Sequence, residues 1–136
     1  MIVLDTNVVS ELMKTAPDPR VQDWLMSLDA VRLTTTAVTV TEIEYGLQRL
    51  PEGQRKTALQ ERFAAFAEAM AVLPLDDGSA RRAGQLRAMR EVAGKPTTAS
   101  DMMIAGIAAV ADAILATRNH KDFDGLPLRI VNPWLG

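Results

Sequence analysis

Hydrophobic residues along this chain form short apolar runs that alternate with longer stretches of helical period. The first run, Ile2-Val3-Leu4, is too short for a helix and suits a strand that is covered on both faces. Further short or β-branched runs predict strands at residues 31–35, 72–75, 113–117 and 128–131. The strand at 72–75 is expected near a sheet edge, because Pro74 cannot donate to a ladder.

The longer stretches place apolar residues on one face of a helix. Asp18-Pro19 is a typical helix start, and Val21, Trp24 and Leu28 follow it at helical spacing. Further helices are predicted from about residue 38 to 50 and across 59–70. Another is predicted to follow the loop at 76–79 and to end at about 92. A last helix across 101–108 is expected to be capped by Thr98 or Ser100. Strands that alternate with helices predict a single α/β domain over residues 1–136, with a mainly parallel central sheet and helices on both faces.

The composition is ordinary for a globular protein, with 48% hydrophobic and 24% charged residues. A chain of 136 residues is long enough to bury a proper core. The absence of cysteine excludes disulfides and thiolate metal sites. A net charge of −2 argues against a protein that simply coats nucleic acid, but it allows a nuclease with a locally basic groove.

Neither a leader nor a membrane segment is predicted. The N-terminus lacks the cationic start and the apolar core of a signal peptide. The longest apolar stretch, residues 102–115, is interrupted by Asp112 and is too short to span a bilayer. We therefore expect a cytoplasmic protein.

Three isolated acids, Asp5, Glu42 and Asp101, adjoin apolar elements. Asp5 stands at the carboxyl end of the first predicted strand, where open α/β sheets place their ligand crevices. Each acid also has a plain structural explanation: Asp5 as a strand-end cap, Glu42 as solvated helix surface, and Asp101 as a favourable charge in a first helical turn.

In combination, the three acids favour a metal site. Like charges gathered at one end of a parallel sheet repel one another unless a hard cation neutralises them. Oxygen ligands without cysteine favour Mg²⁺ or Mn²⁺ over zinc. Such a site suits phosphodiester hydrolysis, because the ion activates a water molecule and neutralises charge on the phosphate.

The segment after the predicted strand at 113–117 is rich in polar groups and is expected beside Asp5 if both strands are central. It contains Arg118, Asn119, His120, Lys121 and Asp122. His120 is the only histidine, and a surface position is its simplest explanation.

Arginine and tryptophan residues are interpreted structurally. One predicted helix is basic, and a solvated face explains its charges better than a phosphate track does; its arginines are Arg81, Arg82, Arg87 and Arg90. Trp24 and Trp134 are interpreted as core or interface anchors rather than base-stacking platforms.

Four segments of the sequence carry a family pattern: Val3–Val8, Thr41–Gly46, Ala99–Ala105 and Thr117–Phe123. Together with Asn132-Pro133-Trp134, they resemble the PIN-domain family, and most closely its VapC-type toxins of the FitB-like subgroup. The resemblance covers essentially the whole chain in order. The four segments are specific jointly, although each is weak alone.

The resemblance implies a three-layer α/β/α PIN fold and a Mg²⁺- or Mn²⁺-dependent endoribonuclease that cleaves RNA by hydrolysis and inhibits translation and growth. It also implies the toxin of a type II toxin–antitoxin pair, a homodimer silenced by a cognate VapB-like antitoxin. The family's metal-binding acids correspond to Asp5 and Asp101, and Glu42 completes the acidic trio, binding the ion through water or positioning the attacking water.

Polar neighbours of these acids also match the family pattern. Thr6, Asn7 and Thr117 are expected to orient the carboxylates, and Arg118 is expected to contact the phosphate. The chain departs from many PIN domains at the fourth acid, where the aligned residue is Asn119. Asp122 lies three residues on and is the expected substitute, so we predict one tightly held ion.

Other functions fit the sequence less well. A haloacid-dehalogenase-like phosphatase needs a second Asp where Asn7 stands, and a receiver domain needs an acidic pair where Asp5-Thr6 stands. The alternative that remains open is a non-catalytic PIN-like module that binds RNA or a partner. The sequence does not identify the RNA.

Overall fold

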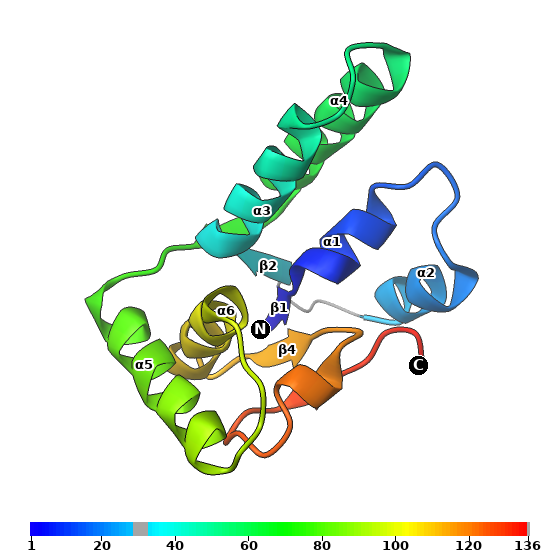
Figure 1. Cartoon of the computed structure of the whole chain (residues 1–136). Helices are drawn as coiled ribbons and strands as arrows, with labels where there is room; N and C mark the ends of the chain where they lie inside the picture. The colour runs from blue at the N-terminus through cyan, green and yellow to red at the C-terminus, as the bar shows by residue number, and fades with distance from the viewer. Residues whose placement is uncertain (29–32, 136) are drawn as a thin grey trace.

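The computed structural model describes residues 1–28 and 33–135. In this part of the chain, parallel strands form one sheet in the order β3-β2-β1-β4-β5. Figure 1 labels the three inner strands β2, β1 and β4. The strands are β1 (Ile2–Leu4), β2 (Leu33–Thr36), β3 (Ala71–Leu73), β4 (Ile114–Ala116) and β5 (Ile130–Val131). The central position of β1, the edge position of β3 and the parallel sheet confirm the predictions. Val31 and Arg32, from the predicted strand at 31–35, lie outside the described residues.

The helices that connect the strands cover both faces of the sheet (Figure 1). They are α1 (Thr6–Leu12), α2 (Pro19–Met26), α3 (Ala37–Gln48), α4 (Gln54–Ala69), α5 (Asp77–Val92) and α6 (Ala99–Val110), with a short 3₁₀ turn, η1 (His120–Asp122). Successive side chains of a strand point to opposite faces, so Ile2 and Leu4 join one core and Val3 joins the other. The core around Ile2 and Leu4 includes residues of α1 to α4, and the core around Val3 includes residues of α5 and α6. The result is the predicted three-layer α/β/α arrangement.

Local capping signals set several helix starts. Asp18 caps α2 with Pro19 at its first position, as predicted. Thr98, rather than Ser100, caps α6, because its hydroxyl accepts the backbone N–H of Asp101. Trp24 and Trp134 are both buried in the core around Leu4, which confirms their interpretation as anchors.

The helix α1 was not predicted. Its residues Thr6, Val8 and Val9 are β-branched and have weak helix propensity. Val8 and Val9 are fully buried, and Asp5 caps the helix by accepting the backbone N–H of Thr6. Tertiary packing therefore stabilises a helix that local propensity does not favour.

The helices α5 and α6 pack very closely at Gly106. A Cβ atom at this position would lie 2.5 Å from the carbonyl oxygen of Ser79 and 2.7 Å from the backbone nitrogen of Ala83. Only glycine allows the two backbones to approach this closely. This contact fixes the position of α6, which carries Asp101.

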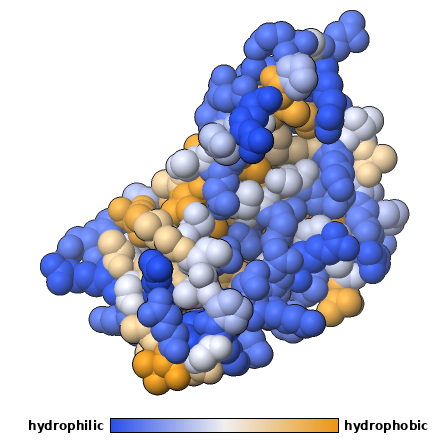
Figure 2. Space-filling view, in the orientation of Figure 1, coloured by the Kyte–Doolittle hydropathy of each residue, from blue (hydrophilic) through white to orange (hydrophobic). Residues whose placement is uncertain are grey.

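The surface is mainly polar, with apolar side chains between the α3–α4 hairpin and α1 (Figure 2). A groove of about 280 Å³ lies there, and its lining includes Thr6, Glu42, Ile43, Leu47 and Leu59. Within the described ranges, no helix combines the length and the apolar character that crossing a membrane requires.

Candidate active site

Asp5 follows β1 directly and is 4% exposed. Its backbone N–H donates to the carbonyl of Ala116 on the neighbouring β4 at 2.9 Å. Its Oδ1 accepts the backbone N–H of Thr6 at 2.8 Å, and its Oδ2 accepts the hydroxyl of Thr117 at 2.7 Å and the amide of Asn7 at 3.2 Å. These contacts hold the carboxylate in one orientation at the carboxyl edge of the sheet.

Asn7 and Thr117 also connect the start of α1 to the segment after β4. The side-chain amide of Asn7 donates to Oγ1 of Thr117 at 3.3 Å, and its Oδ1 accepts the backbone N–H of Arg118 at 3.1 Å. The hydroxyl oxygen of Thr117 accepts the backbone N–H of Asn119 at 3.2 Å. The sequence therefore predicted correctly that this segment lies beside Asp5.

Glu42 reaches the same edge from α3. Its Oε1 accepts the hydroxyl of Thr6 at 2.8 Å. The Thr6 hydroxyl also lies 3.2 Å from Oγ1 of Thr39, a buried residue that was not predicted as part of the site. Glu44, two residues on, instead pairs with Gln48 on the exposed side of the helix. Thr39 follows the cap Thr36 by three residues, and that spacing was the available signal.

The charges of four acids act on one another at this edge. The pKa of Asp5 is raised to about 6, chiefly by burial and with smaller contributions from the charges of Asp101 and Glu42, against hydrogen bonds from Thr117 and Thr6 that lower it. Burial also raises the pKa of Asp101, with additional contributions from the charges of Asp122 and Glu42. The structure thus brings together the acids that the sequence selected.

The donor set fits a hard cation. Within residues 1–28 and 33–135, no lysine or arginine forms an ion pair with Asp5, Glu42, Asp101 or Asp122, so no direct ion pair offsets their mutual repulsion. The charge of Arg90 acts on Asp101 more weakly than burial does and lowers its pKa. In the same ranges, no three acidic or histidine side chains stand so that they could enclose an ion together. Mg²⁺ characteristically binds one or two carboxylates and keeps several waters. A pair of direct ligands therefore suits this geometry better than an all-protein cage.

The residues that follow Thr117 make separate contacts. The guanidinium of Arg118 lies 4.9 Å from the centre of the Trp134 ring, while its backbone contacts Asn7. Asn119 is exposed and contributes its backbone N–H to the network, and η1 places Asp122 near Asp101. His120 is exposed, in agreement with its surface interpretation.

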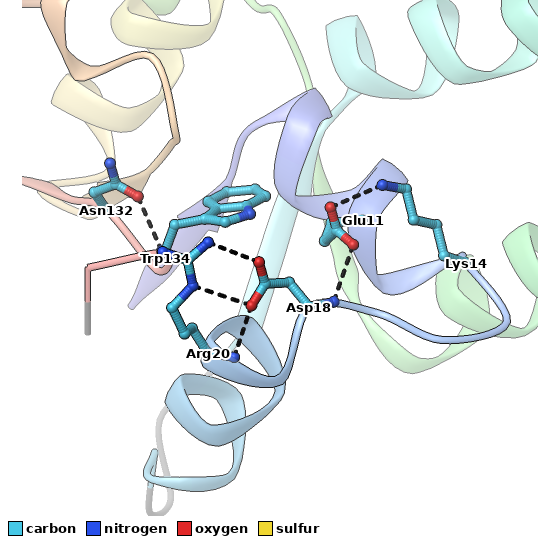
Figure 3. Close-up of polar contacts among 6 residues, drawn as sticks. All are labelled: Glu11, Lys14, Asp18, Arg20, Asn132 and Trp134. Carbon is cyan, nitrogen blue, oxygen red and sulfur yellow. Dashed lines mark hydrogen bonds and ion pairs between the residues drawn. The ribbon is translucent and has the colours of Figure 1, made fainter.

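A further buried acid, Glu11, serves the fold (Figure 3). Its two oxygens accept the ammonium group of Lys14 at 3.0 Å and the backbone N–H of Asp18 at 3.1 Å. Asp18 in turn pairs with Arg20, and the backbone N–H of Trp134 donates to the side chain of Asn132 (Figure 3). Glu11 therefore holds the α1–α2 loop and does not belong to the acidic site.

The basic helix α5 only partly matches its interpretation as a solvated face. Three arginines pair with polar neighbours on the same helix: Arg81 with Asp77, Arg82 with Gln85 and Arg87 with Glu91. Arg90 is 3% exposed, so the interpretation is wrong for this residue. Its side chain turns inward because backbone carbonyls of two loops accept its N–H groups.

The chain as a whole is similar to known proteins. The family described as the PIN domain matches residues 2–127. The chain belongs to the PIN-domain family. This PIN domain is 39% identical to VapC ribonuclease Y4jK of Sinorhizobium fredii, over 98% of each chain. It is 34% identical to the toxin FitB of Neisseria gonorrhoeae, over 98% of this chain and 99% of that one.

A solved structure shares the fold of this PIN domain. The structure of FitAB bound to a DNA fragment superimposes with a TM-score of 0.87 and 35% identity, over 98% of this chain and 96% of that one. These similarities confirm the family resemblance and the PIN fold that the four sequence segments implied.

Proposed function

We propose that this PIN domain is a metal-dependent endoribonuclease, the toxin of a VapBC-type pair that inhibits translation and growth. The observation that carries the proposal is the convergence of Asp5, Glu42, Asp101 and Asp122 at one sheet edge, where none of them forms an ion pair with a described lysine or arginine. The relatives named as a VapC ribonuclease and as the toxin FitB support the assignment of RNA as substrate and of the toxin role.

In this proposal, Asp5 and Asp101 would hold one Mg²⁺ or Mn²⁺ ion. When bound, the ion supplies a Lewis acid that activates water and neutralises charge on the phosphate. Thr6, Asn7 and Thr117 keep the carboxylate of Asp5 fixed through their hydrogen bonds. Because Asp5 is held in place before substrate binds, little reorganisation is needed during the reaction.

Glu42 is assigned to the attacking water. Its Oε1 is held by the hydroxyl of Thr6, and within the described part of the chain its Oε2 accepts no protein hydrogen bond. That oxygen is therefore free to accept a proton from a water molecule and to orient the water oxygen toward the phosphorus. Water attack makes the reaction a hydrolysis and leaves the ribose 2′-hydroxyl unused. Asp122 adds negative charge beside Asp101, and Arg118 is assigned to the phosphate of the substrate.

The test uses purified protein and single-stranded RNA, with Mg²⁺, Mn²⁺ or a chelator. The Asp5→Asn and Glu42→Gln variants are expected to lose cleavage, and Asp5→Asn should also relieve growth inhibition on overexpression. Glu44→Gln, on the same helix but paired with Gln48, is the matched control and should cleave like the parent. Cleavage by Asp5→Asn at the parent's rate, or undiminished cleavage in chelator, would refute the proposal.

Further measurements test whether water is the attacking group and whether the protein is a non-catalytic PIN-like module instead. RNA with a single 2′-deoxyribose at the cut site should still be cut, since the proposed attack comes from water. A parent protein that binds RNA without cutting it in any metal would instead support the non-catalytic PIN-like module.

The proposed partner is a VapB-like antitoxin, and the proposed assembly is a homodimer. A chain of the FitAB structure is similar to this chain, and the relative FitB is named as a toxin, which supports the existence of such a partner. The groove between α1 and the α3–α4 hairpin begins at Thr6 and Glu42 and continues along Ile43, Leu47 and Leu59. A partner tail seated there would reach the acidic site directly.

A further inference from the structure

Arg90 lies in the last turn of α5 and is 3% exposed. Its Nη1 donates to the carbonyl oxygens of Asp124 at 2.7 Å and Lys121 at 3.3 Å, and its Nη2 donates to the carbonyl oxygen of Pro96 at 2.9 Å. In the described residues it forms no ion pair, and its Nε is buried without a partner. Burial of a guanidinium without a paired carboxylate costs free energy, so a buried arginine in this position indicates a specific role.

The carbonyl groups that Arg90 binds belong to the two segments that carry Asp101 and Asp122. Pro96 lies two residues before Thr98, whose hydroxyl caps α6 by accepting the backbone N–H of Asp101 at 3.1 Å. Lys121 and Asp124 stand on either side of Asp122 in the loop around η1. One planar group therefore joins the start of α6 to the loop that holds the fourth acid.

We propose that Arg90 is a positioning residue of the acidic site, whose guanidinium fork fixes the separation of Asp101 and Asp122 and thereby sets the affinity for the divalent ion. The inference rests on the proposed function and deepens it. Residues that orient metal ligands from outside typically change metal affinity by about 10- to 100-fold when they are replaced. Because the two nitrogens of the fork bind different segments, its shape, and not only its charge, is required.

A second contact between the same segments is weaker. The ammonium group of Lys95 lies 3.5 Å from the carboxylate of Asp124, and their side chains are 40% and 67% exposed. Exposed ion pairs contribute little to stability. Lys95 therefore cannot replace the buried connection that Arg90 makes.

The test compares Arg90→Lys, which keeps the charge but loses the fork, with Arg90→Gln, which loses both. The matched control is Lys56→Gln, because Lys56 is also a buried cation but contacts Glu52 and the carbonyl of Gln48 at the α3–α4 turn. Calorimetric titration with Mn²⁺ alone measures metal affinity, and RNA cleavage is followed as a function of Mg²⁺ concentration. Both Arg90 variants should bind Mn²⁺ about tenfold more weakly or worse and need correspondingly more Mg²⁺ for half-maximal cleavage. Lys56→Gln should lower the melting temperature but leave Mn²⁺ affinity at the parent value.

Parent-like Mn²⁺ affinity in Arg90→Lys would overturn the inference, because charge alone would then suffice. If the Arg90 variants do not fold, hydrogen exchange of the parent decides. Mn²⁺ should slow amide exchange in residues 94–98 and 119–125 together, and slowing in only one of the segments would overturn the inference. Failure of the proposed function is distinguishable, since a parent that neither cleaves RNA nor binds Mn²⁺ refutes that proposal itself.

Discussion

The hydroxyl group of Thr117 donates a hydrogen bond of 2.7 Å to Oδ2 of Asp5, 112 residues earlier in the chain. Each residue directly follows a strand, Asp5 after β1 and Thr117 after β4, and these strands are parallel neighbours. The carboxyl ends of parallel neighbours meet at one edge of the sheet, which is where α/β proteins bind ligands. The bond favours the ionised carboxylate, but burial outweighs it and raises the pKa of Asp5 to about 6.

We expect ionisation of Asp5 to destabilise the metal-free fold as the pH rises. Its pKa is raised from 3.8 to about 6, chiefly by burial, so the folded state holds the proton more tightly than the unfolded state does. The stability contributed by the protonated group is complete below about pH 4 and is lost as the pH rises through about 6. In chelator, the free energy of unfolding of the parent relative to Asp5→Asn should fall by about 2 kcal/mol between about pH 4 and pH 7. Urea denaturation at the two pH values measures this difference.

A variant of Thr117 tests whether the pKa of Asp5 causes this pH dependence of stability. Thr117→Val removes a hydrogen bond that lowers the pKa of Asp5, so the loss of stability should move to higher pH. Thr57→Val, which removes an exposed hydroxyl that donates to the carbonyl of Gly53, should leave the pH dependence unchanged. Equal pH dependence in the parent and in Asp5→Asn would contradict the assignment.

Asp122→Ala should reduce cleavage more than Asn119→Ala. The charge of Asp122 is felt by Asp101, whereas Asn119 contributes its backbone N–H, which alanine retains. We expect a loss of about tenfold or more for Asp122→Ala, the range typical of groups around metal ligands. RNA cleavage rates at saturating Mg²⁺ measure the two losses. Negligible losses in both variants would exclude the segment after β4 from the site.

Asp101→Asn should melt at a higher temperature than the parent in chelator. Burial and the neighbouring charges of Asp122 and Glu42 raise the pKa of Asp101, so its ionised form is disfavoured in the metal-free fold. The margin should vanish with Mg²⁺, because an ion that binds only the folded parent stabilises it by mass action. Thermal melts of both proteins, with and without Mg²⁺, measure the effect. Melting temperatures that do not respond to Mg²⁺ would argue that the acids form no common site.

Gly106→Ala should destabilise the protein by about 1–3 kcal/mol, the usual cost of overpacking. The new Cβ atom would meet backbone atoms of Ser79 and Ala83, which cannot move without separating α5 from α6. Gly84→Ala is the matched control, because nothing lies within 4 Å of its Cβ position and alanine favours the helix. In urea denaturation, the free energy of unfolding should therefore fall in Gly106→Ala and rise in Gly84→Ala. An unchanged free energy of unfolding in Gly106→Ala would contradict the close approach of α5 and α6.

An arginine in the antitoxin tail should be required for full inhibition. The planar guanidinium pairs bidentately with carboxylates, and the four acids have no ion-pair partner among the described residues of their own chain. Cleavage assays with a tail in which every arginine and lysine is replaced by alanine should show weakened inhibition. Full inhibition by that tail would disprove this mode of binding.

Local sequence signals determined where most elements begin and end. The apolar run before Asp5, the Asp18-Pro19 start, the edge strand before Pro74 and the α5 end near Val92 each depend on neighbouring residues alone. The candidate acids were also selected from the sequence, because each adjoins an apolar element that the structure buries. The resemblance to PIN domains added their expected roles.

Only the tertiary structure decided how distant residues meet. Weak local propensity concealed α1, which depends on the burial of Val8 and Val9. Arg90 appeared as one more surface charge, because the carbonyl groups that draw it inward belong to loops up to 34 residues away in sequence. The raised pKa values of Asp5 and Asp101 have the same origin. Burial and the approach of like charges depend on distances through space, and these are set only when the strands pair and the helices pack.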